Sequence, residues 1–141
     1  MSHSPCATIR TGLFRRLALA GLFASLAGAA QAADVAAGKA QFEDACGLCH
    51  SAAPGDGLGG MGPDLHGLSG KAAATADKAF PYSAALKASN LAWDAATLDR
   101  FLAAPTKVVP GTGMVVAVPA KAARDDIVAY LLSAKQASPA K

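Results

Sequence analysis

Two cysteines and a histidine occur together once in the chain, as Cys46-Gly47-Leu48-Cys49-His50. In a helical turn, residues i, i+3 and i+4 share one face, so both thiols and the imidazole would point the same way. Four kinds of site use parts of this pattern: a disulfide, a zinc ion, a redox-active dithiol and a covalently attached haem. The rest of the chain has to agree with one of them.

The remaining cysteines and histidines favour the haem. A bridge between Cys46 and Cys49 would close a very small loop and constrain little. A structural zinc ion needs four ligands, usually from two separated pairs, and only His3 and His66 remain as further histidines. A thioredoxin-type dithiol belongs in a β-α-β context, which the sequence does not provide. C-x-x-C-H is a known haem-attachment spacing, so the motif predicts two thioether links and a histidine ligand.

The first 33 residues are typical of a cleaved secretory signal peptide. Three arginines precede an apolar stretch over residues 17–30, and Ala30-Gln31-Ala32 supplies a small-x-small cleavage pattern. The apolar stretch is shorter than the roughly 20 residues of a membrane span. We therefore expect export to the periplasm and one domain over residues 34–141, without stable membrane insertion unless the signal is retained as an anchor.

Removing the signal changes the charge balance and exposes a shortage of large core residues. Residues 34–141 contain ten acidic and ten basic side chains, so electrostatics give no reason to expect nucleic-acid binding. Alanine supplies much of the apolar fraction, and alanine fills little volume. The aromatic residues of this segment are few: Phe42, Phe80, Tyr82, Trp93, Phe101 and Tyr130. We expect a bound group to fill the centre.

The hydrophobic pattern predicts a small all-α fold. Asp34 would cap a helix over residues 35–45, with Val35, Gln41, Phe42 and Ala45 near one stripe. Gly38 interrupts this helix, which indicates close approach by another backbone. Further helices are expected after a Ser83 cap, from Asp94 to a stop at Pro105, and over about residues 120–135. The stretch 108–119 is expected to be an ordered loop.

A haem iron held by one histidine has an opposite position to fill, and two methionines of the segment are candidates. Met61 lies in a glycine-rich loop, where packing or exposure is the expected role. Met114 lies in a loop shaped by proline and glycine, which would present one side chain rigidly. Histidine with methionine raises the reduction potential and leaves no open site for chemistry, which suits electron transfer.

Several motifs in one order resemble class I cytochromes c of mitochondrial and bacterial type. They are "AAGKAQFEDACGLCH", "GPDLHGLSG", "FPYSAAL", Trp93, "PGTGMVV" and "RDDIVAYLLSA". The resemblance covers nearly all of the segment after the signal. It implies a small single-domain all-α fold wrapped around one covalent haem c.

The resemblance also implies roles for individual residues. Cys46 and Cys49 match the thioether cysteines, and His50 and Met114 match the two axial ligands of the iron. Four further residues match the haem environment. Pro63 would accept a hydrogen bond from the ligand histidine, Tyr82 and Trp93 would bond a haem propionate, and Thr112 lies beside the methionine loop. Gly38 and Phe42 match the contact where the terminal helices cross, with Tyr130 on the other side.

The chain departs from the family pattern at several positions. Lys71 stands where many relatives have an arginine facing a propionate, and a lysine lacks the bidentate fork. Leu86 and Phe101 replace a frequent asparagine and tyrosine near the methionine. Gly113 replaces a frequent lysine, and only Lys107 remains in the segment before it. Long-range electrostatic steering of partners should therefore be modest.

These observations predict a periplasmic monohaem c-type cytochrome that carries one electron at a time in a respiratory or related chain. Its partners would be an electron-donor and an electron-acceptor protein, and it would not be an enzyme. Two alternatives remain. The chain could be a dedicated haem c subunit of a dehydrogenase or oxidase complex. It could also respond to peroxide or a gas, if Met114 left the iron.

Overall fold

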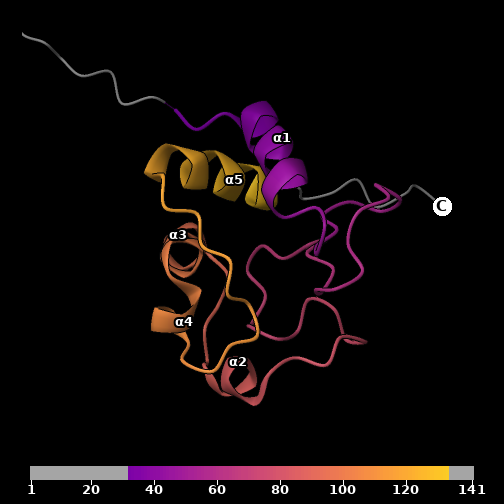
Figure 1. Ribbon diagram of the computed structural model, residues 1–141, viewed down its shortest axis with the longest axis vertical. Helices are drawn as coiled ribbons and strands as arrows, with labels where there is room; N and C mark the ends of the chain where they lie inside the picture. The colour runs from indigo at the N-terminus through magenta and orange to yellow at the C-terminus, as the bar shows by residue number, and fades with distance from the viewer. Residues whose placement is uncertain (1–31, 134–141) are drawn as a thin grey trace, which may run out of the picture. The chain divides into compact units, whose positions relative to one another are not determined.

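The computed structural model describes residues 32–133, which all belong to one unit beginning at Gln31. The predicted signal peptide lies almost wholly outside these residues. Within them, five helices form the regular structure (Figure 1): α1 (Val35–Ala45), α2 (Ala84–Ala88), α3 (Ala95–Ala103), α4 (Pro105–Val108) and α5 (Lys121–Ser133). The only β pairing in this range is one bridge between Ala72 and Ala92. The predicted all-α fold is confirmed.

Three of the helices begin at the side-chain caps that the sequence predicts. The Asp34 carboxylate accepts hydrogen bonds from the N–H groups of Ala36 and Ala37 at the start of α1. The Ser83 hydroxyl caps α2, and the Asp94 carboxylate caps α3. Such caps satisfy backbone N–H groups that have no partner inside the helix.

The sequence predicts that the helix after Asp94 stops at Pro105, but it does not predict the short helix that follows. α3 ends at Ala103, and Pro105 then begins the short helix α4. Proline suits the first position of a helix because the N–H that it lacks would have no partner there. From Val109 to Pro119 the chain forms the expected loop, which we call the ligand loop.

The terminal helices α1 and α5 pack against each other, as Figure 1 shows. A Cβ added at Gly38 would lie 1.9 Å from the carbonyl oxygen of Asp126, so only glycine fits at this contact. The rings of Phe42 and Tyr130 meet one turn further along, with centroids 5.5 Å apart. The expected backbone approach at Gly38 and the contact of Phe42 with Tyr130 are both confirmed.

The predicted stripe on α1 is wrong at both ends. Val35 is 43% exposed and Ala45 is exposed, whereas the buried positions are Gly38, Phe42 and Cys46. These positions are four apart and therefore lie on one face. Gly38 lies in the packed face of α1. A search for apolar side chains does not identify a glycine as part of such a face.

One hydrophobic core joins α1, α3 and α5 and surrounds a cavity. Its buried members include Phe42, Leu98, Phe101, Ile127 and Leu131, each of which also lines the cavity. α3 packs against both α4 and α5. No helix within residues 32–133 has the length and apolarity to cross a bilayer.

Candidate functional site

The C-x-x-C-H segment continues the winding of the chain beyond the end of α1. The carbonyl of Cys46 accepts hydrogen bonds from the N–H groups of Cys49, at 3.0 Å, and His50, at 2.8 Å. This turn brings Cys46, Cys49 and His50 to the wall of the same cavity. No disulfide joins Cys46 and Cys49. Burial raises the pKa of the Cys46 thiol, and the neighbouring Cys49 raises it further.

The cavity has a volume of about 420 Å³ and reaches from this turn to the ligand loop. That volume lies within the range of about 300–1,000 Å³ that is typical of ligand pockets. Leucine, phenylalanine and alanine side chains form much of its wall, as an apolar macrocycle requires.

The imidazole of His50 is held in one tautomer. Its Nδ1 atom lies 2.8 Å from the carbonyl oxygen of Pro63. A carbonyl only accepts hydrogen bonds, so Nδ1 carries a proton, and in the neutral ring Nε2 then keeps its lone pair. His50 is 9% exposed. A neutral imidazole fixed in this way offers a metal ion one nitrogen in a defined orientation.

Gly62 is a functional residue that the sequence did not reveal. A Cβ at this position would lie 2.5 Å from Cε1 and 2.8 Å from Nδ1 of His50. The Gly62 N–H also donates to the carbonyl of Cys49, at 2.8 Å. The ring of His50 therefore packs directly against the backbone of Gly62. Only the glycine immediately before a proline could have hinted at this contact.

Asp56 holds the loop that follows His50. Its carboxylate accepts hydrogen bonds from the Ser51 hydroxyl and from the N–H groups of Ala52, Ala53 and Leu58. Burial works against the charged form of Asp56, but these hydrogen bonds outweigh it and lower the pKa of the carboxyl group. The sequence analysis did not single out this residue.

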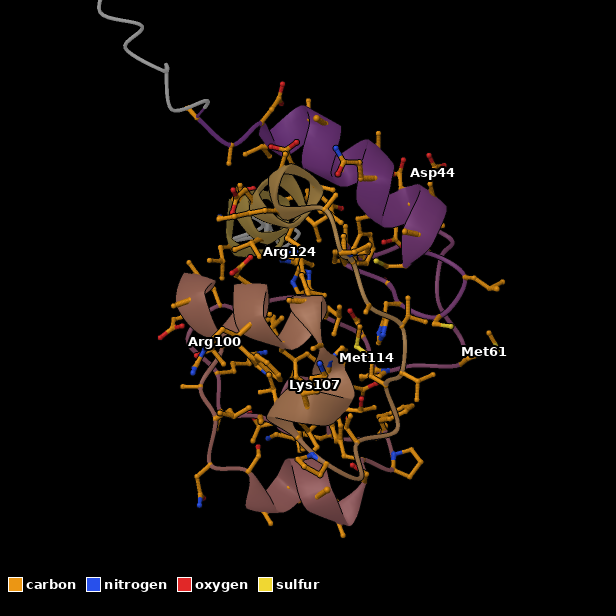
Figure 2. All side chains as sticks on the ribbon, turned by 60° about the vertical axis from the view of Figure 1, so that its left-hand side comes forward. Asp44, Met61, Arg100, Lys107, Met114 and Arg124 are labelled. Atoms are coloured by element: carbon orange, nitrogen blue, oxygen red, sulfur yellow. The ribbon has the colours of Figure 1, made fainter. Side chains whose placement is uncertain are left out.

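Figure 2 shows Met61 at the edge of the molecule, whereas Met114 is partly buried. Both contribute to the cavity wall, but the Met61 residue is 63% exposed, whereas Met114 packs against the hydrophobic core. The buried Thr112 accepts a hydrogen bond from the Met114 N–H at 3.4 Å through its hydroxyl. The ligand loop thus presents a thioether to the cavity that His50 also lines.

The two aromatic residues expected near a propionate are both buried and both line the cavity. The Tyr82 hydroxyl accepts a hydrogen bond from the Asp77 N–H at 3.0 Å, which leaves its own proton free to donate. Burial raises the pKa of Tyr82, so the hydroxyl stays protonated at neutral pH. Trp93 packs edge-on against Phe101.

The positions that depart from the family pattern make the methionine side of the cavity apolar. Leu86 and Phe101 both line it, where a polar pair would offer hydrogen bonds. Lys71 directs its ammonium group to the carbonyl of His66, at 3.5 Å. Gly113 has open space around it and adds no charge.

The donor set fits a haem attached through thioethers. Two thiols, one tautomerically fixed imidazole and the thioether of the partly buried Met114 line a single cavity with an apolar wall. Within residues 32–133, no three His, Cys, Asp or Glu side chains gather as a metal site made of such ligands requires. The zinc interpretation needs such a cluster.

Known proteins with similar sequences are cytochromes c. The family model described as cytochrome c matches residues 35–135. A cytochrome c2 from Rhodoblastus acidophilus is 45% identical over 87 residues, covering 61% of this chain and 79% of that protein. A cytochrome c from Euglena viridis is 39% identical over 103 residues, covering 72% and 98%.

A solved structure resembles this fold. It is cytochrome cH from Methylobacterium extorquens, with a TM-score of 0.63 and 40% sequence identity. The match covers 71% of this chain and 98% of the solved one.

Proposed function

Because the chain belongs to the cytochrome c family, we propose that it is an exported electron carrier of a respiratory or related electron-transfer chain. Members of this family carry one covalently bound haem c and transfer electrons to redox partners, so the protein is a carrier and not an enzyme. What we propose beyond the family's general role is that the protein works in the periplasm and in a respiratory or related chain.

Cys46 and Cys49 would hold the cofactor through two thioethers, and His50 and Met114 would ligate its iron. The observation that carries this assignment is the 2.8 Å contact between His50 Nδ1 and the Pro63 carbonyl. It leaves Nε2 as the only nitrogen of the ring that can bind a metal, in a cavity that Met114 also lines. Pro63 would fix the ring, Tyr82 and Trp93 would face the propionates, and Thr112 would steady Met114.

These residues suit electron transfer and not a reaction at the metal. When bound, haem c supplies a one-electron couple between ferrous and ferric iron. An imidazole and a thioether would occupy both axial positions, and such a pair raises the potential. An apolar wall would limit the access of water to the haem. This would favour ferrous over ferric iron, because ferrous haem carries the lower net charge.

A redox titration of the purified protein tests this function. We expect one haem c per chain and a single reversible transition with a slope of about 59 mV per tenfold change in the ratio of oxidised to reduced protein. A two-electron slope, or a haem that does not return to its starting state, would contradict the proposal.

The export proposal has its own test. Residues 1–33 would be removed, so the mass of the periplasmic protein should equal that of a chain starting near Asp34 plus one haem. Recovery of the full-length chain in the membrane fraction would instead support a retained anchor.

One observation favours a second candidate, a dedicated haem subunit of a larger complex. Leu48 lies between the two cysteines, is 77% exposed and is not among the residues that line the cavity. A permanent partner would cover such apolar side chains. Co-purification of a stable partner from the native host at high salt would support this candidate, and a monomer at every salt concentration would contradict it.

A further inference from the structure

Arg124 is a buried cation in the first turn of α5. It is 9% exposed, although arginine is almost never buried without partners. Its Nε donates to Asp99 of α3 at 2.8 Å. Its Nη1 donates to two carbonyl oxygens at the end of the ligand loop, Val118 at 3.0 Å and Pro119 at 2.7 Å. Figure 2 shows Arg124 between α5 and α3.

These contacts fall at the point where the ligand loop returns to the core. The loop is held on its first side by the buried residues Val109 and Thr112, where the Thr112 N–H donates to the Val109 carbonyl at 3.0 Å. After Met114, residues 115–117 are all exposed. The next backbone hydrogen bond runs from the Val118 N–H to the Leu102 carbonyl of α3, at 2.8 Å.

Val118 is therefore the second anchor of the loop, and Arg124 holds its carbonyl. Three residues lie between Met114 and this anchor, and the four steps of chain from Met114 to Val118 reach at most about 14 Å when fully extended. If the anchor detached, no backbone hydrogen bond of residues 115–117 would hold this segment, and only the apolar contacts of Val115 and Val116 at the cavity wall would remain. The freedom of Met114 to move away from the cavity thus depends on what holds Val118 and Pro119.

The geometry needs an arginine and not merely a positive charge. The planar guanidinium directs Nε to a carboxylate and Nη1 to two carbonyls at the same time. A lysine offers one compact ammonium group on a flexible stem and would serve one side or the other. Hydrogen bonds to a charged group are also stronger than neutral ones.

We propose that Arg124 is a positioning residue for Met114, because it fastens the end of the ligand loop to α3 and so limits how often Met114 leaves the iron. This inference rests on the proposed function, in which Met114 is an iron ligand. Arg124 itself is not among the residues that line the cavity.

The test measures imidazole binding to the ferric holoprotein, because imidazole reaches the iron only after Met114 has left it. We expect Arg124→Met to raise the binding rate about tenfold or more, as expected for the loss of hydrogen bonds to a charged group. Arg124→Lys should give a smaller increase, and it replaces Arg124→Met if that variant does not fold. Loss of the methionine–iron charge-transfer band on warming should occur at a lower temperature in both variants.

The control is Val128→Ala, which shortens a buried side chain on the same helix that does not line the cavity. It should lower the unfolding temperature while keeping the imidazole rate within about twofold of wild type, since cavity formation affects global stability. Arg124 has only a structural role if Arg124→Met and Val128→Ala raise the imidazole-binding rate equally at matched loss of stability. The same conclusion follows if neither variant raises this rate. A wild-type spectrum without the charge-transfer band would instead refute the ligation by Met114 and with it the proposed function.

Discussion

At the scale of single residues, the site depends on backbone that lies against the histidine ring. Gly62 leaves no room for a side chain next to His50. We expect Gly62→Ala to lower the free energy of unfolding of the holoprotein by about 1–3 kcal/mol, as overpacking usually does. It should also disturb the contact between His50 and Pro63, which a changed ferric spectrum would reveal.

Gly113→Ala is the matched control, because a Cβ at Gly113 meets no protein atom within 4 Å. Denaturant unfolding of both variants, followed by circular dichroism, makes the comparison. Equal stability of the two variants would show that the packing of Gly62 against the imidazole is unimportant.

Asp56 makes a pH-dependent contribution at the same scale. Because hydrogen bonds lower its pKa in the folded state, its stabilisation is fully present above the unfolded pKa of about 3.9. It is lost as the pH falls through the lower folded pKa. Asp56→Asn should therefore be less stable than wild type at pH 7, with a difference that shrinks in acid. Unfolding curves at several pH values below 5 check this, and a constant difference would refute it.

The residue-level predictions from sequence were best where one motif carried the chemistry. Cys46, Cys49 and His50 are adjacent in the chain, so their common face follows from helical spacing alone. Gly62 and Arg124 act through contacts with residues distant in sequence or with backbone carbonyls. No spacing rule reveals such contacts.

At the scale of elements, the crossing of α1 and α5 is the most constrained contact. Gly38→Ala would improve helix propensity by about 1 kcal/mol in isolation. Here the new Cβ meets the backbone of Asp126, which cannot rotate away as a side chain could. We expect a net loss of about 1–3 kcal/mol in the free energy of unfolding. Thermal unfolding of the holoprotein measures it, and a variant as stable as wild type would contradict the contact.

Helix starts could be predicted because capping is local. Asp34, Ser83 and Asp94 each cap the helix that immediately follows. The packing face of α1 and the helix α4 were missed for a different reason. A glycine can be the centre of a packed face, and a proline that ends one helix can begin another. Both outcomes depend on tertiary packing.

At the scale of the whole molecule, the core is built around the cavity. Phe42, Leu98 and Ile127 are buried and line it at the same time. A group that binds only the native state stabilises it by mass action, and a covalent one does so permanently. We expect the doubly substituted variant Cys46→Ala/Cys49→Ala, without haem, to show little helical circular dichroism and no cooperative transition. A sharp thermal transition in that variant would refute this expectation.

The central claim is that His50 and Met114 hold one haem iron between them, and the ferric absorption spectrum tests it most directly. Wild type and Met61→Ala should both show the methionine–iron charge-transfer band, because Met61 is exposed at the edge of the cavity. Met114→Ala should lose the band while keeping its covalent haem. A band that survives in Met114→Ala, or that disappears in Met61→Ala, would contradict the account.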